Sequence, residues 1–84
     1  MELVDRLDAV ETRDDLARFL EEAVADLTGG GAGWENVRLE DFLEAWAAWL
    51  KDMPGVFANR SEPVPDQPDW RLVARMVMAA RMYE

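Results

Sequence analysis

The chain contains no cysteine and no histidine among its 84 residues. Their absence excludes disulfides, thiolate or imidazole metal sites, cysteine nucleophiles and histidine-based catalytic triads. Basic residues are also scarce, with nine Lys or Arg against 18 Asp or Glu and a formal net charge of −9. Because binding to nucleic acid or an anionic membrane needs basic residues, this charge argues against both. We therefore expect no catalytic residue, no cofactor, no metal site and no enzymatic activity.

Long hydrophobic runs are missing as well. The longest unbroken ones, residues 45–50 and 77–80, are far shorter than the roughly 20 residues that cross a membrane as a helix. The N-terminal residues lack the basic start and apolar run of a signal peptide. The length predicts one domain, residues 1–84, and we expect it to be cytoplasmic.

Apolar residues recur at helical spacing in four segments, which predicts an all-α, single-domain bundle of three main helices and a short N-terminal helix. Glycines are expected to stop the second helix, and Pro54-Gly55 to end the third. The expected helices span about residues 2–9, 13–28, 39–53 and 69–82, with a glycine-rich linker at 29–33 and a proline-rich loop at 54–68.

Two apolar stripes are expected to face the core. The second helix contributes Leu16, Phe19, Leu20, Ala23, Val24 and Leu27, and the third contributes Leu39, Phe42, Leu43, Trp46, Trp49, Leu50 and Met53. We expect Trp34 and Trp70 to hold the loops onto the bundle. On the last helix, Arg71, Arg75, Met78 and Met82 lie away from the main apolar side. We expect this side to pack within the molecule; the alternatives are a partner or a second copy.

Several short segments occur in a recognisable order along the chain. They include Trp34-Glu35-Asn36, Leu39-Glu40-Asp41-Phe42-Leu43-Glu44-Ala45, Pro68-Asp69-Trp70 and Tyr83-Glu84. Over about residues 12–84, this order resembles that of a small bacterial all-helical family catalogued only as a domain of unknown function. The resemblance implies an all-helical single domain and brings no activity. Arg38 departs from the Ser or Thr expected as a helix cap, which leaves Asn36 as an alternative cap.

The negative charge is concentrated in the first part of the chain. Residues 1–52 hold 14 acidic and five basic residues, whereas residues 53–84 hold four of each. Such segregation either guides a basic partner to an acidic face or simply keeps the protein soluble. The candidate partner-binding residues are Glu40, Asp41, Glu44, Trp34, Asn36 and Asn59. For those in loops or at helix ends, the alternative role is to tie the loops to the bundle by hydrogen bonds.

These observations favour a non-enzymatic, small acidic protein–protein interaction module. An immunity- or antitoxin-type inhibitor, or a regulatory partner of a basic protein, fits that description. One alternative is a small-ligand binder, using a groove lined by Trp46 and Trp49 with Phe42, Phe57 and Tyr83 nearby. Another is a homo-oligomeric accessory protein that associates through Met78 and Met82. The expected state is a monomer or a weak homodimer.

Overall fold

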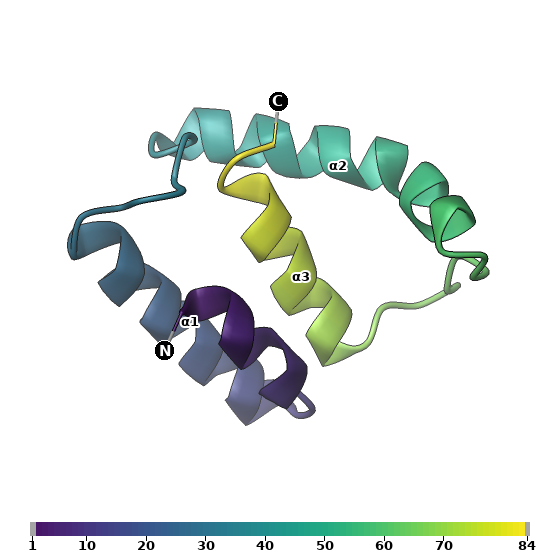
Figure 1. Cartoon of the computed structure of the whole chain (residues 1–84), viewed down its shortest axis with the longest axis horizontal. Helices are drawn as coiled ribbons and strands as arrows, with labels where there is room; N and C mark the ends of the chain where they lie inside the picture. Colours follow the sequence, from purple (N-terminus) through teal and green to yellow (C-terminus); the bar gives the residue numbers. More distant parts are fainter. Residues whose placement is uncertain (1, 84) are drawn as a thin grey trace.

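The computed structural model describes residues 2–83, so Met1 and Glu84, which belong to the expected domain, lie outside the described residues. Four helices follow one another along the chain (Figure 1). No strand occurs within residues 2–83. The prediction of an all-α fold with three main helices and a short N-terminal one is confirmed. The helices are η1 (Leu3–Ala9), which is a 3₁₀ helix, α1 (Arg13–Thr28), α2 (Leu39–Asn59) and α3 (Trp70–Ala80).

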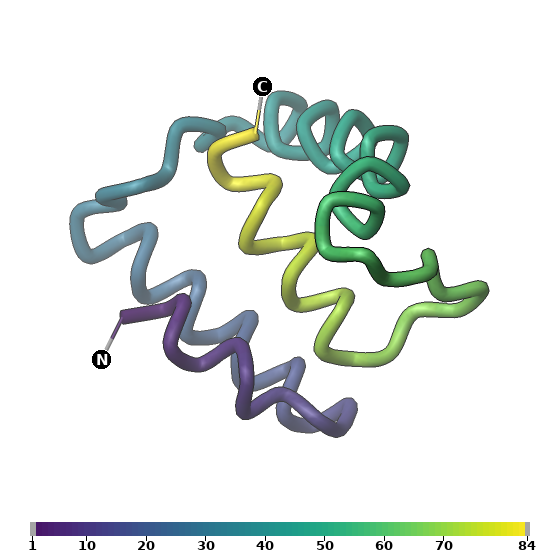
Figure 2. Tube along the Cα trace, turned by 45° about the vertical axis from the view of Figure 1, so that its right-hand side comes forward, coloured from purple at the N-terminus to yellow at the C-terminus, as the bar shows by residue number. Residues whose placement is uncertain are grey.

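The last helix, α3, lies between α1 and α2 (Figure 1) and packs against each of them. Helix η1 packs on α1 and α3 together. No Cα atom of α1 lies within 8 Å of a Cα atom of α2. The molecule measures 36 × 27 × 18 Å. Figure 2, turned by 45°, again shows the chain of α3 between the two outer helices. Helix α3 is therefore the centre of the fold.

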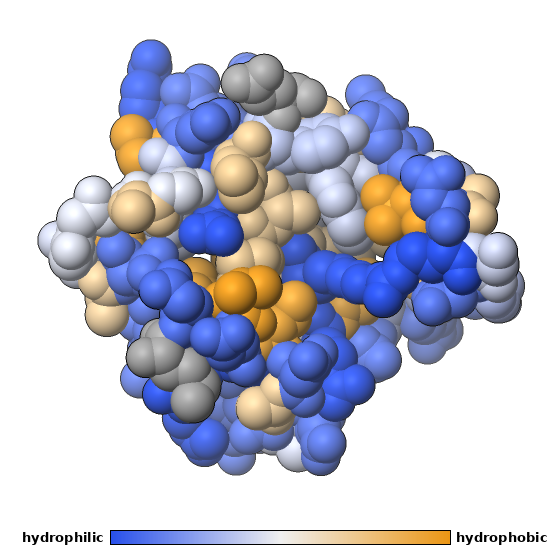
Figure 3. All heavy atoms as spheres, in the orientation of Figure 1, coloured by the Kyte–Doolittle hydropathy of each residue, from blue (hydrophilic) through white to orange (hydrophobic). Residues whose placement is uncertain are grey.

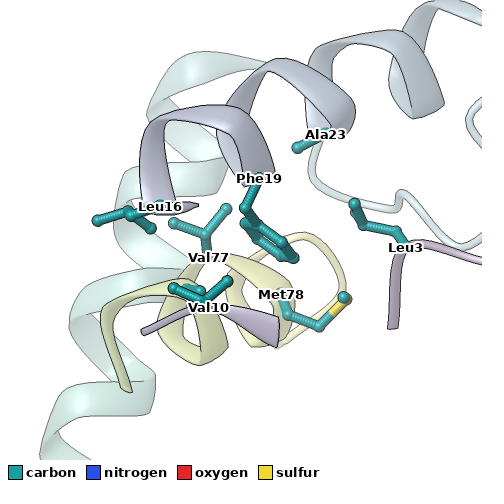
Figure 4. Packing of buried hydrophobic residues seen from close by; sticks show 8 residues of the cluster. Leu3, Val10, Leu16, Phe19, Ala23, Val77 and Met78 are labelled. Atoms are coloured by element: carbon teal, nitrogen blue, oxygen red, sulfur yellow. The ribbon is translucent and has the colours of Figure 1, made fainter. Parts of the chain in front are cut away.

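The hydrophobic core consists of two clusters, and α3 contributes to both. Figure 4 shows Phe19 of α1 pointing into the group formed by Val10, Val77 and Met78. Phe19 and Val10 are each only 2% exposed. The first cluster comprises Leu3, Val10, Leu16, Phe19, Ala23, Ala74, Val77 and Met78, and the second comprises Trp49, Phe57, Leu72 and Met76.

The first residues of α1 and α3 are fixed by hydrogen bonds to capping side chains. Thr12 Oγ1 accepts a hydrogen bond from the backbone N–H of Asp15, whose carboxylate accepts in return from the backbone N–H of Thr12. Gly29 follows the last residue of α1. The carboxylate of Asp69 accepts from the backbone N–H of Leu72 at 2.7 Å, so Asp69 caps α3 instead of beginning it. Helix α3 also ends at Ala80, short of the expected end at residue 82.

Helix α2 is longer than the sequence suggests. It passes the expected end at Met53, continues through Pro54 and Gly55, and ends at Asn59. A proline inside a helix removes one backbone donor and strains the preceding turn. Phe57, beyond the proline, is 6% exposed and belongs to the second core cluster, so its burial offsets that cost. The proline-rich connection is accordingly shorter than the expected loop and occupies residues 60–69.

Several apolar residues expected in the core lie at the surface instead. Leu20 and Val24 of α1 are 40% and 61% exposed. Leu39, Leu43 and Leu50 of α2 are exposed to a similar degree. The helix arrangement explains the difference, because α1 and α2 have no backbone contact with each other and each packs on α3 along only part of its apolar side. Figure 3 shows one face of the molecule, where hydrophobic patches interrupt a largely hydrophilic surface.

The last helix agrees with one expectation and differs from another. Met78 lies on the side of α3 that was expected to pack within the molecule, and it is 8% exposed because η1 and α1 cover that side. Only Met82 of that pair is exposed. Trp70 was expected to hold a loop onto the bundle, yet it is 44% exposed and its indole has no hydrogen bond within residues 2–83. Association through both methionines is therefore not available in this fold.

Candidate interaction surface

Asn36 joins the linker after α1 to the far end of the chain. Its side-chain Nδ2 donates hydrogen bonds to the backbone carbonyls of Ala80 and Tyr83, at 2.9 and 2.8 Å. The backbone N–H groups of Glu35 and Asn36 both donate to the carbonyl of Arg81 at 2.8 Å. Asn36 therefore does not cap α2. Arg38 occupies the cap position without a side-chain hydrogen bond to the helix.

Trp34 holds the same linker against the helices on both sides. Its indole N–H donates to the carboxylate of Asp26 at 2.8 Å. Its ring stacks on Phe42, with centroids 6.2 Å apart and planes 21° from parallel, and Phe42 meets Trp46 edge-on. Offset stacking and edge-to-face contacts are the favourable arrangements for aromatic pairs. The expectation that Trp34 ties the linker to the bundle agrees with this geometry.

A shallow hollow brings three of the six candidate residues together. Asp41 and Glu44 line it from α2, and Asn36 and Tyr83 line it from the linker and the C-terminal segment. Its volume is about 300 Å³, and Ala45 and Ala48 complete the wall. The hydrogen-bonded linker thus places Asn36 beside an acidic side of α2.

The other two α2 candidates lie elsewhere. Glu40 pairs with the neighbouring Arg38 and does not line the hollow. Asn59 is at the opposite end of α2 from Asp41. At 1.5 Å per residue, these two positions are about 27 Å apart along the helix. Asn59 therefore does not belong to the same site.

Sequence reasoning missed a contact between the C-terminal segment and α2. The phenol of Tyr83 donates a hydrogen bond to the carboxylate of Asp52. That hydrogen bond, together with desolvation and the negative charge of Asp52, raises the pKa of Tyr83 above its usual value of 10.0. Tyr83 is thus held protonated beside an acidic helix face. Nothing in the local sequence pairs residues so far apart, because the contact depends on where α3 directs the last residues.

The second feature of α2 is a line of exposed leucines, hereafter the α2 stripe (Leu39, Leu43 and Leu50). They are 70%, 52% and 41% exposed. Spacings of four and seven residues place all three on one line along the helix. Glu40 lies three residues before Leu43, so these two side chains are neighbours on the helix surface and Glu40 borders the stripe. Glu44 follows Leu43 and lies about 100° further round the helix, on the side of the hollow. The apolar stripe therefore has an acidic border near the start of α2.

The structure packs Trp49 and Phe57 in the second core cluster, with Trp46 partly buried against it. Four hollows on the described surface are lined by other residues and not by Trp46 or Trp49. Both tryptophans thus serve the core, which agrees with the usual role of an aromatic stripe at helical spacing.

Within residues 2–83, no group of three or more acidic side chains is arranged to hold a metal ion. None of the described helices combines the length and the hydrophobicity needed to cross a membrane. The exposed carboxylates and leucines of α2 provide ion-pairing and apolar contact.

Comparison with known proteins adds a family. Residues 12–84 match the model of a family of unknown function, DUF7660, and the chain belongs to it. The expected resemblance to a domain of unknown function is thereby confirmed. No curated protein and no solved structure matches the chain.

Proposed function

We propose that the protein is a non-enzymatic protein–protein interaction module whose helix α2 binds a basic, amphipathic segment of a partner. The observation that carries the proposal is the α2 stripe with the acidic residues beside it, Glu40 and Glu44. Apolar residues gathered on one surface and rimmed by polar groups are typical of interaction sites. An amphipathic segment laid along a helix buries such leucines at regular spacing.

The charge of the chain supports a basic partner. The net charge is −9, and 14 of the 18 acidic residues lie within residues 1–52, which contain α1 and most of α2. Complementary charge speeds the encounter of two proteins and orients them, and salt weakens this effect. A second copy of this chain is a poorer occupant, because two surfaces of the same negative charge repel each other.

The α2 stripe and the acidic residues beside it play different parts in binding. Burial of the α2 stripe supplies affinity, since apolar surface removed from water contributes about 25 cal/mol per Å². Glu40 and Glu44 act mainly on the association rate and on the choice of partner. In this proposal the module works in the cytoplasm as an inhibitor of immunity or antitoxin type, or as a regulatory partner, of a basic protein.

The test is capture from host lysate by the immobilised protein at low and at high salt, followed by mass spectrometry. The expected result is one basic protein, lost at high salt and lost with Leu43→Ser. Leu20→Ser is the matched control, because Leu20 is also exposed but lies on α1. Equal capture by both variants, or no basic protein at either salt concentration, contradicts the proposal.

A charge-reversal variant separates the two contributions. Glu40→Lys with Glu44→Lys is expected to slow association with the captured protein and to reduce its salt dependence, while Leu43→Ser is expected to speed dissociation. Surface plasmon resonance measures both rates. A salt-independent association rate in the unmodified protein contradicts the role of charge.

A further inference from the structure

A second hollow, unrelated to the α2 stripe, lies between η1, the end of α2 and the beginning of α3. Its volume is about 320 Å³, within the roughly 300–1,000 Å³ range of small-molecule sites. Its apolar lining includes Phe57 and Leu72, which are 6% and 7% exposed. Three arginines, Arg60, Arg71 and Arg75, also line it.

The gathering of these arginines is unusual for this chain. The protein has a net charge of −9 and only nine basic residues, and three of them share one hollow. Arg71 and Arg75 lie one turn apart on α3, and the fold brings Arg60, the residue directly after α2, to the same hollow. Arginine presents a planar set of donors that matches carboxylate and phosphate groups.

Two of the arginines have only weak acidic partners. Arg60 Nε lies 3.9 Å from Glu62, and Arg71 Nη2 lies 3.7 Å from Glu11, with all four side chains 45% or more exposed. Exposed ion pairs of this kind contribute little and exchange readily. Arg71 Nε also donates to the backbone carbonyl of Val10 at 3.2 Å, which fixes the plane of its guanidinium group.

Arg75 has no ion pair or side-chain hydrogen bond with any other residue between 2 and 83, although it is partly buried. It follows Arg71 by one helical turn, so both side chains project from the same side of α3. A partly desolvated guanidinium without an acceptor is stabilised by an incoming anion.

The lining also includes three carboxylates, those of Asp8, Glu62 and Asp69, and their charges oppose an incoming anion. The carboxylate of Asp69 is engaged with the backbone N–H of Leu72, and Glu62 is paired with Arg60. Asp8 is the lining carboxylate without an ion pair or hydrogen bond among the described residues. Asp8 is therefore the lining carboxylate whose charge is least offset by a partner, and its removal should favour binding of an anion most.

We propose that this hollow binds a small amphiphilic anion. Its carboxylate or phosphate group accepts hydrogen bonds from Arg75 and Arg71, and its apolar chain lies against Leu72 and Phe57. The size of the hollow favours a free small molecule. This site is independent of the proposed function of α2, because the two share no residue.

The test uses octyl phosphate and octanoate as probes, each below its micelle concentration, with 1-octanol and inorganic phosphate as matched controls. Binding is followed by NMR of the arginine side-chain Nε–H groups and the backbone amides. We expect saturable shifts at Arg71 and Arg75 with at least one amphiphilic anion, and at least fivefold weaker binding of either control. The probe that binds more tightly, octyl phosphate or octanoate, identifies the preferred headgroup as phosphate or carboxylate.

Variants locate the site. Arg75→Gln is expected to weaken binding at least fivefold, and Asp8→Asn to strengthen it. Arg13→Gln, on α1 and outside this lining, leaves binding unchanged. Circular dichroism establishes that each variant is folded. Equal binding of 1-octanol or inorganic phosphate, unchanged binding by Arg75→Gln and Asp8→Asn, or shifts confined to the α2 stripe would overturn the assignment.

Discussion

The side-chain Nδ2 group of Asn36 donates a hydrogen bond to the backbone carbonyl of Tyr83, 2.8 Å away and 47 residues further along the chain. The same nitrogen donates to the carbonyl of Ala80. One amide thereby fixes the linker, the end of α3 and the C-terminal segment relative to one another. It also places Tyr83 where its phenol reaches Asp52 on α2.

Replacing Asn36 by alanine is expected to destabilise the protein. The substitution leaves two partly buried carbonyls without a donor, which costs about 1–3 kcal/mol. Urea unfolding followed by tryptophan fluorescence measures the change. Asn59→Ala is the control, because Asn59 is exposed and makes no side-chain hydrogen bond within residues 2–83; it should shift stability by less than about 0.5 kcal/mol. Equal effects of the two substitutions would show that the Asn36 hydrogen bonds do not hold the linker.

Two glycine-to-alanine substitutions are expected to have opposite effects. Gly33 has a φ of +89°, and an added Cβ would lie 2.9 Å from Nη1 of Arg81. Gly33→Ala therefore destabilises the fold by about 1–2 kcal/mol from backbone strain alone. Gly55 lies inside α2, and an added Cβ would meet nothing within 4 Å. Gly55→Ala should stabilise by about 0.5–1 kcal/mol.

Thermal unfolding by circular dichroism compares the two glycine variants with the unmodified protein. A rise in melting temperature for Gly55→Ala and a fall for Gly33→Ala is the expected pattern. A fall for Gly55→Ala would contradict the continuous helix through Pro54 and Gly55, since alanine stabilises only where the backbone is helical.

The hydrogen bond from Tyr83 to Asp52 predicts a late phenol titration. Because the bond raises the pKa of Tyr83, the stability that it contributes is complete below pH 10.0 and is lost as pH rises through the folded-state pKa. Tyr83 is the only tyrosine, so absorbance near 295 nm follows it alone. Asp52→Asn is expected to lower the titration midpoint. An unchanged midpoint in that variant would mean that Asp52 is not the cause of the shift.

Asp15 is expected to titrate early. Hydrogen bonds from the backbone N–H groups of Glu11 and Thr12 lower the pKa of its carboxyl group below the usual 3.8. The stability contributed by this group is therefore present above pH 3.8 and is lost as pH falls through the folded-state pKa. NMR of the Asp15 carboxyl carbon should give a lower midpoint in the folded protein than in urea. Identical midpoints would contradict the capping box.

The sequence predicts best where a local signal decides the structure. The bounds of α1 follow from Thr12 with Asp15 at one end and Gly29 at the other, all within hydrogen-bonding reach of the helix that they limit. The end of α2 could not be read in this way. Pro54 is a local stop signal, but burial of Phe57 against Leu72 and Met76 of α3 outweighs it.

In the candidate site, too, the sequence predicts what local signals decide and not what the packing of distant helices decides. The periodicity of α2 identifies a broad apolar side but does not say which part of it α3 covers, so Leu43 and Trp49 look alike in the sequence. In the structure, Leu43 is 52% exposed and Trp49 only 6%. The arginine hollow was beyond prediction, because Arg60 and Arg75 meet only after α2 and α3 have packed.

The central position of α3 affects how the chain reaches its final form during synthesis. Once a growing polypeptide has been extended through Asn59, it contains both outer helices, yet these have no backbone contact with each other. Helix α1 can pack against η1 by then, but the residues of α3 that belong to both core clusters have not yet been made. Both clusters are therefore complete only when α3 appears, and we expect the domain to fold in one all-or-none step.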